Sequence, residues 1–185
     1  MVIKYFVCSI ILLLFSYFVF RVLVRKDYRN RQKLSPFSYV LEALVFALHA
    51  NFAYLFISAR WPNLPRLPKN VTINLVSFAI IGFGLVILII AWFGLGTRQS
   101  FGLDKNKLKT GGIYHFSRNP QIVGYGMILI AFAILYFSWY SIGWFILYLI
   151  ISYFMIRTEE EFLGLKYGEV YEKYCNTVPR IIKLL

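Results

Sequence analysis

The amino-acid sequence predicts an all-α integral membrane protein with five transmembrane helices and a cytoplasmic C-terminal amphipathic helix. Of its 185 residues, 59% are hydrophobic and only 15% are charged, and its mean hydropathy is +0.65. A soluble domain carries about a quarter charged residues, and its apolar residues do not form runs long enough to cross a bilayer. The low content of Cys, Gly and Pro excludes a disulfide scaffold and a collagen-like chain.

Apolar runs of about 20 residues, the length that crosses a hydrocarbon layer of about 30 Å, predict the transmembrane helices. They cover residues 3–24, 36–59 and 71–93, and a longer stretch covers 120–156. That stretch is about twice the length of one crossing, and Ser138, Ser141 and Gly143 lie near its middle. We therefore expect two helices there, 120–137 and 139–156, joined by a tight turn. Residues 1–185 are expected to form a single membrane domain.

The positions of the basic residues predict the orientation in the membrane. A net charge of +12 is also typical of nucleic-acid-binding proteins, but here the 20 Lys and Arg side chains flank the apolar runs, so we expect no nucleic-acid partner. Sixteen of them lie in residues 21–33, residues 98–118 and the tail from Arg157. Basic residues accumulate on the cytoplasmic side, which predicts a cytoplasmic C-terminus and an external N-terminus. The membrane is then the cytoplasmic membrane of a bacterium or the endoplasmic reticulum of a eukaryote.

After the last apolar run, the sequence predicts a cytoplasmic amphipathic helix over about 159–178. Its apolar positions recur at helical spacing and so share one face. These positions are Leu163, Tyr167, Val170, Tyr171, Tyr174 and Val178. Glu159, Glu160 and Glu161 precede them, and acidic side chains are favoured at a helix N-terminus. We therefore expect this helix to begin at the glutamates.

Two ionisable residues, Glu42 and His49, fall within the second predicted span. Ionisable groups inside a membrane are costly and are candidates for function. A separation of seven residues is nearly two helical turns, so both side chains project from one face. Two interpretations stay open: a shared polar cavity, or hydrogen bonds that join neighbouring helices.

A second polar group lies in the C-terminal half of the chain. The motif Gly112-x-Tyr114-x-x-x-Arg118-Asn119-Pro120 comes directly before a predicted helix. After about forty residues come Glu159-Glu160-x-x-Leu163, then Tyr167-Gly168, Tyr171-x-x-Tyr174 and Val178-Pro179. In order and separation these motifs resemble the membrane methyltransferases related to isoprenylcysteine carboxyl methyltransferase and the phospholipid N-methyltransferases. The resemblance covers residues 108–180, and the first three helices match only in number and hydropathy.

This resemblance implies a binding site for S-adenosyl-L-methionine within residues 108–180. It implies Arg118, Asn119 and Glu160 as catalytic residues. The implied cofactor-binding residues are Gly112, Tyr114, Asn119, Pro120, Gln121, Tyr153, Arg157, Glu159 and Glu160. No metal site is implied.

The chemistry of S-adenosyl-L-methionine fits these residue types. Carboxylates such as Glu159 and Glu160 accept hydrogen bonds from the ribose hydroxyls or the ammonium group. Arg118 or Arg157 pairs with the carboxylate of the cofactor. A tyrosine ring such as Tyr153 stacks or forms a hydrogen bond.

The sequence departs from the family pattern at two positions. Asn119 stands where most members have histidine, and Ile122 replaces a tyrosine that often follows the proline by two residues. Asparagine donates and accepts hydrogen bonds but transfers no proton. Tyr125, about one turn after Ile122, is a candidate substitute for the missing tyrosine.

The implied reaction is methyl transfer to a lipophilic acceptor, either the carboxylate of a prenylated cysteine or a lipid head group, at the cytoplasmic face. Membrane sterol reductases share the C-terminal motifs and use NADPH, but they need roughly twice as many helices. A non-catalytic membrane scaffold or transporter that keeps the fold is the other alternative, and it would tolerate the changes at Asn119 and Ile122. The sequence leaves the acceptor and the oligomeric state open.

Overall fold

The computed structural model describes residues 1–57, 65–95 and 108–182, and these residues form helices and connecting turns without a strand. The first three elements, α1 (Val2–Tyr17), the π-helical η1 (Phe18–Val24) and α2 (Arg25–Arg31), make one continuous helix of 30 residues. The remaining elements are α3 (Pro36–Asn51), the 3-10 helix η2 (Phe52–Leu55), α4 (Val71–Leu95), the 3-10 helix η3 (Gly112–His115), α6 (Pro120–Leu135), α7 (Trp139–Tyr167) and α8 (Glu169–Thr177).

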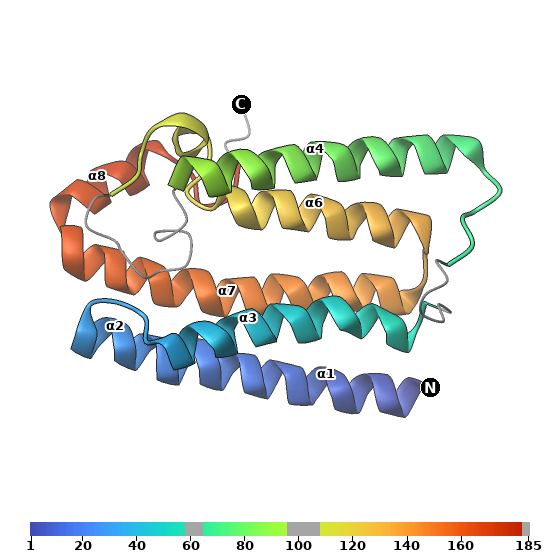
Figure 1. Cartoon of the computed structure of the whole chain (residues 1–185), viewed down its shortest axis with the longest axis horizontal. Coiled ribbons are helices and arrows are strands. Elements are labelled where there is room, and N and C mark those ends of the chain that lie inside the picture. Colours follow the sequence, from blue (N-terminus) through green and yellow to red (C-terminus); the bar gives the residue numbers. More distant parts are fainter. Residues whose placement is uncertain (58–64, 96–107, 183–185) are drawn as a thin grey trace.

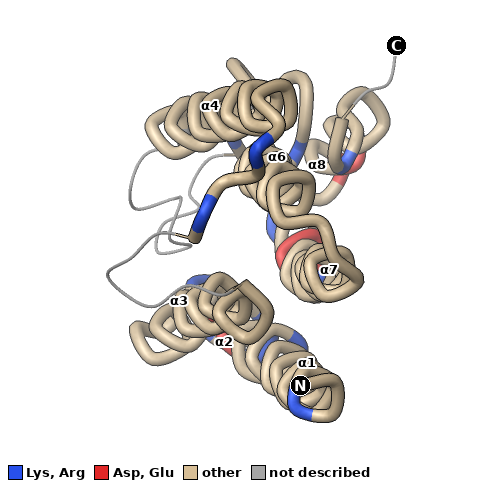
Figure 2. The backbone as a smooth tube through the Cα atoms, turned by 90° about the vertical axis from the view of Figure 1, so that its right-hand side faces the viewer, with Lys and Arg blue, Asp and Glu red and all other residues tan. Residues whose placement is uncertain are grey.

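The long helices lie side by side in two groups that α7 connects (Figure 1, Figure 2). Helix α4 packs along α6, and α1 packs against α3, while α7 contacts α6, α1 and α3. Helices α2 and α8 and the start of α6 gather at one end of the bundle, and the N-terminus lies at the other (Figure 1). The described parts of the three basic segments therefore share one end, which the charge pattern predicts to be cytoplasmic.

Within the described residues, four helices are long and apolar enough to cross a membrane, namely Val2–Arg31, Pro36–Leu55, Val71–Gly94 and Trp139–Tyr167. Helix α6 has 16 residues and spans about 24 Å, which is less than the hydrocarbon thickness of about 30 Å. The protein is thus a helical membrane protein with at least four candidate spans, and the fifth crossing stays a prediction.

The turn expected in the 120–156 stretch is present, and its sequence explains where α7 begins. Helix α6 ends at Leu135 and α7 starts at Trp139. The Ser138 side chain accepts a hydrogen bond from the backbone N–H of Ser141 at 3.1 Å, and the Ser141 hydroxyl accepts one from the Ser138 N–H at 2.9 Å. This reciprocal pair satisfies two amide groups that a helix N-terminus leaves without partners.

The predicted end of the fifth span at residue 156 and the predicted start of the amphipathic helix at Glu159 were wrong. No helix begins at Glu159, because α7 continues without a break to Tyr167 and ends where Gly168 adopts a φ of +49°. Glutamate, leucine and lysine are strong helix formers, so the change from apolar to polar sequence does not end the helix. The amphipathic helix is consequently only α8, with nine residues.

The first helix likewise extends beyond the predicted residue 24 to Arg31, and Gln32 ends it in the left-handed conformation. The second helix ends at Leu55, so its predicted extension over residues 56 and 57 was wrong, and the predicted residues 58 and 59 lie outside the described part. The predicted helices 71–93 and 120–137 agree with α4 and α6 within two residues at each end.

The α4–α6 pair packs so closely that the two backbones touch. A Cβ atom added to Gly84 would lie 2.7 Å from the carbonyl oxygen of Gly124, and one added to Gly124 would lie 2.7 Å from that of Gly84. Small residues at such crossings let membrane helices approach closely. This contact fixes α6, and with it the loop that precedes α6, against α4.

His49 joins α3 to α7. Its side chain is fully buried, and its Nε2 lies 3.1 Å from the carbonyl oxygen of Trp144. The indole Nε1 of Trp144 donates to the carbonyl oxygen of His49 at 2.7 Å, and the two rings stack. For His49 the structure therefore agrees with the interpretation that it connects neighbouring helices, and Glu42 is only partly buried.

We expect Gly84→Ala to destabilise the protein by about 1–3 kcal/mol, because the added methyl group overlaps the α6 backbone. Gly82→Ala is the matched control, since a Cβ on Gly82 meets no atom within 4 Å and alanine is the better helix former. Thermal unfolding of the purified protein in detergent measures both. Equal melting temperatures for the two variants would show that the helices do not touch at Gly84.

Candidate functional site

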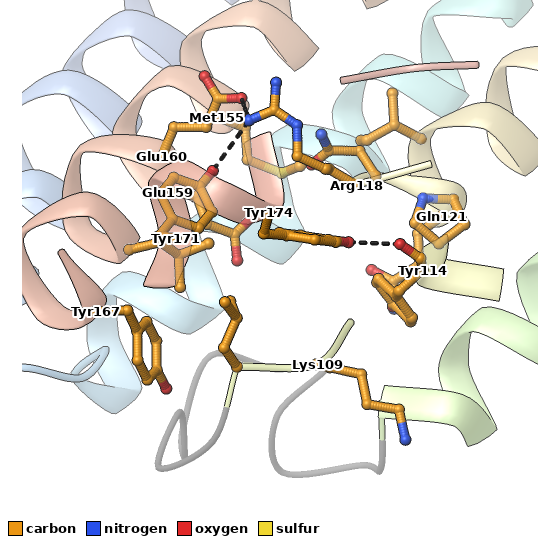
Figure 3. Close-up of a pocket in the computed structure, with 15 residues that line it drawn as sticks. Lys109, Tyr114, Arg118, Gln121, Met155, Glu159, Glu160, Tyr167, Tyr171 and Tyr174 are labelled. Carbon is orange, nitrogen blue, oxygen red and sulfur yellow. Dashed lines mark hydrogen bonds and ion pairs between the residues drawn. The ribbon is translucent and has the colours of Figure 1, made fainter. Parts of the chain in front are cut away.

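A cavity lies where the loop before α6 meets the C-terminal half of α7 and helix α8 (Figure 3). It contains about 770 Å³ of space that no atom fills, part of it open to solvent. Its polar and aromatic lining residues are Lys109, Tyr114, Arg118, Asn119, Gln121, Glu159, Glu160, Tyr167, Tyr171 and Tyr174. Its apolar lining residues are Leu108, Pro120, Ile122, Met155 and Leu163.

An ion pair between Arg118 and Glu160 links the start of α6 to α7 across this cavity. Arg118 Nη1 lies 3.1 Å from Glu160 Oε1, and the two side chains are only 13% and 17% exposed. The guanidinium of Arg180 donates to both carboxylate oxygens of Glu160, from Nε at 2.9 Å and from Nη2 at 2.6 Å. These hydrogen bonds raise the pKa of Arg180 above its already high value, so Arg180 stays charged at physiological pH.

One N–H group of Arg118 forms no hydrogen bond with the described residues. Its Nη1 lies 3.5 Å from the Tyr171 hydroxyl and also contacts Cys175 Sγ. Its Nε is buried and has no hydrogen-bond partner among the described residues. A buried donor without a partner is unfavourable. An oxygen atom of a bound ligand would satisfy this group.

Hydrogen bonds join helix α8 and the segment after it to the loop before α6. The Arg118 N–H donates to the carbonyl oxygen of Pro179 at 3.0 Å, and Asn119 Nδ2 donates to that of Arg180 at 2.9 Å. The hydroxyl of Tyr174 donates to the carbonyl oxygen of Tyr114 at 2.6 Å (Figure 3). These bonds hold α8 and the C-terminal segment against the start of α6.

The two cavity tyrosines of α8 are neutral hydrogen-bonding groups. Burial raises the pKa of Tyr174 to about 12. Burial, with a further contribution from the negative charge of Glu160, also raises the pKa of Tyr171. Both hydroxyls therefore keep their protons at physiological pH, and Tyr174 donates its proton to the carbonyl oxygen of Tyr114.

The three consecutive glutamates of α7 face different neighbours, because successive helical residues are turned by about 100°. Glu159 and Glu160 line the cavity. Glu161 instead accepts hydrogen bonds from Arg21 Nη2 at 2.8 Å and Arg25 Nε at 2.7 Å. Glu161 thus binds α7 to the first long helix.

Most of the residues that the sequence predicts for the site converge on this cavity. The lining includes Tyr114, Arg118, Asn119, Pro120, Gln121, Glu159 and Glu160. Gly112, Tyr153 and Arg157 are not among the lining residues. Arg157 is 59% exposed and lies 3.8 Å from Glu161, and it donates to the hydroxyl of Tyr153, which is 49% exposed.

Several lining residues were missed by the sequence prediction of the site. Tyr167, Tyr171 and Tyr174 were assigned to a packing stripe, and the face that packs against the bundle is the same face that lines the cavity. Ile122 was considered only as a departure from the family pattern, Met155 resembles any apolar helix residue, and Lys109 has no distinguishing pattern around it. The contact of Arg180 with Glu160 depends on the path of the chain after α8.

The model of the phospholipid methyltransferase family matches residues 73–170, more than half of the chain. The matched segment includes α4, α6 and α7 and all the cavity residues except Tyr171 and Tyr174. No curated protein and no solved structure matches the chain.

We expect Tyr174→Phe to lower the stability by about 1 kcal/mol, because it removes the hydrogen bond to the buried carbonyl group of Tyr114. Tyr17→Phe is the matched control, since no hydrogen bond of the Tyr17 hydroxyl is found within the described residues and its ring is half exposed. Thermal unfolding in detergent compares them. A Tyr174→Phe protein as stable as Tyr17→Phe would show that this bond does not hold α8 in place.

Proposed function

The chain belongs to the phospholipid methyltransferase family, and we propose that it transfers a methyl group from S-adenosyl-L-methionine to a lipophilic acceptor. The family consists of membrane methyltransferases similar to isoprenylcysteine carboxyl methyltransferase. The observation that carries the proposal is the cavity in which Arg118, Glu159 and Glu160 meet a set of tyrosine rings at the end of apolar helices. The family match favours methyl transfer over NADPH-dependent reduction.

The cavity residues fit the functional groups of the cofactor. When bound, S-adenosyl-L-methionine supplies an electrophilic methyl group on a positively charged sulfur. Arg118 Nε, which is buried and has no partner among the described residues, is available to the carboxylate of the cofactor. Glu159 and Glu160 suit its ammonium group or its ribose hydroxyls. The rings of Tyr167 and Tyr171 offer flat surfaces to an adenine.

Catalysis of an in-line methyl displacement rests on the position and the desolvation of the reactants, so no protein nucleophile is required. Arg118 and Arg180 fix the Glu160 carboxylate from two sides. The neutral hydroxyl groups of Tyr171 and Tyr174 add hydrogen bonds without adding charge. The site is therefore organised before a ligand binds, and this limits the cost of ordering it.

The apolar part of the lining suits a lipophilic acceptor. Ile122 and Met155 lie where the apolar parts of α6 and α7 meet the cavity, and Leu163 adds a further apolar side chain, so an acyl or prenyl chain can reach the cavity from the membrane. The charge pattern assigns this end of the bundle to the cytoplasmic face. Prenylated cysteine and lipid head groups both remain acceptor classes under this proposal.

The required proton transfer depends on the acceptor. A carboxylate acceptor needs no base, whereas a protonated amine must first lose a proton. His115 is exposed and His49 is bound to Trp144, and neither lines the cavity. We assign the role of base toward an amine acceptor to Glu159, which lies in the cavity wall.

Equilibrium binding of radiolabelled S-adenosyl-L-methionine to the detergent-purified protein tests the cofactor assignment. We expect saturable binding that S-adenosylhomocysteine displaces and NADPH does not. Absence of binding to folded, monodisperse protein would contradict the proposal. Incubation with lipid extracts then identifies the acceptor by transfer of the label.

Glu160→Gln should weaken cofactor binding at least tenfold, because a charge-assisted hydrogen bond contributes about 1.5–3 kcal/mol. Glu172→Gln is the matched control, since Glu172 is an exposed carboxylate on α8 outside the cavity. Both variants are checked for an unchanged thermal unfolding profile in detergent. Wild-type affinity in a folded Glu160→Gln protein would remove Glu160 from the site.

A further inference from the structure

A second groove lies between α2 and the C-terminal half of α7, and we propose that it binds the phosphate group of an anionic membrane lipid. It contains about 760 Å³ of space that opens to the surface. The lining includes Arg25, Tyr28, Arg29, Thr158, Glu161 and Phe162. The proposal is independent of methyl transfer, because it concerns a lipid that stays bound beside the bundle.

Positive charge exceeds negative charge around this groove. Arg21, Arg25 and Arg29 follow one another at four-residue intervals, which places them on one face of the helix. Arg21 and Arg25 both bind Glu161, at 2.8 and 2.7 Å, and Arg157 lies 3.8 Å from the same carboxylate.

The other carboxylate in the groove lining, Glu160, is already held by Arg118 and Arg180. The lining itself holds two guanidinium groups and two carboxylates, but both carboxylates also pair with arginines that lie outside the lining. An anion that enters the groove would therefore meet carboxylates whose charge is already compensated.

Arg29 is the cation that is available to such an anion. It lines the groove, it is exposed, and it forms no ion pair among the described residues. The planar guanidinium group donates two parallel hydrogen bonds to phosphate oxygens. Arg25, one turn earlier on the same face, has a side chain that is 36% exposed and is within the same groove.

The depth of the groove in the membrane and its apolar edge favour a lipid over a soluble phosphate. Arg25 directly follows the apolar run of the first helix, which places the groove at the depth of lipid phosphate groups. Its wall includes the stacked rings of Tyr28 and Phe162, 4.3 Å apart. Leu165 at its edge is 73% exposed. An apolar edge next to a basic groove suits a molecule with a phosphate and acyl chains.

A different depression beside α2 supplies a control. Lys26 is exposed like Arg29, but it lines a different depression, together with Asp27 and Ser35. There the Asp27 carboxylate accepts a hydrogen bond from the backbone N–H of Ser35 at 2.9 Å and provides local negative charge. Replacement of Lys26 removes the same charge from the same helix without changing the groove.

Thermal unfolding of the full-length protein in mixed micelles tests the proposal, with phosphatidylglycerol or phosphatidylcholine added to a neutral detergent. We expect phosphatidylglycerol alone to raise the melting temperature in a saturable way. Arg29→Gln should raise the half-saturating phosphatidylglycerol content about fivefold, the effect of one basic residue near an anionic surface. Lys26→Gln should leave it unchanged.

Three outcomes would overturn the proposal. One is an absence of any difference between the two lipids, and another is an equal effect of Arg29→Gln and Lys26→Gln. The third is that glycerol 3-phosphate or inorganic phosphate gives the same saturable rise at the same phosphate concentration, which would assign the groove to a soluble phosphate.

Discussion

The ion pair between Arg118 and Glu160 is the contact on which the arrangement of the candidate site depends. It joins the loop before α6 to α7, and both side chains are largely buried. A buried pair is favourable only when further hydrogen bonds satisfy its remaining groups. Arg180 supplies two of them to Glu160, and Tyr171 and Cys175 contact Arg118. Arg118 Nε is a buried donor without a partner among the described residues, and a ligand would complete the network there.

Helix α7 connects this network with the rest of the bundle because its three glutamates point in different directions. Glu160 faces Arg118, and Glu161 faces the arginines of the first long helix. On the far side of the cavity, the contact between Gly84 and Gly124 holds α6 against α4. In addition to the packing along α7, this polar stretch therefore joins the two groups of helices at the end of the bundle where the basic segments gather.

The sequence predicts the parts of the fold that depend on local pattern. Helix α4 is an uninterrupted apolar run, and the turn at Ser138 has a recognisable cap. The motif resemblance also predicts that Arg118 and Glu160 belong to one site although they are far apart in the chain. It does not predict the length of α7, because glutamates are as compatible with a helix interior as with its first turn. Tertiary packing determines that Tyr153 and Arg157 lie outside the cavity lining. It also determines that Arg180 contacts Glu160.

A structure of the protein with S-adenosylhomocysteine bound, determined by electron cryomicroscopy or crystallography, would test the central claim most directly. The account predicts the product in the cavity between the start of α6, α7 and α8, with its carboxylate within hydrogen-bond distance of Arg118 and its polar groups next to Glu159 or Glu160. Product bound at another place, for example beside His49 and Trp144, with the Arg118–Glu160 cavity empty, would contradict it.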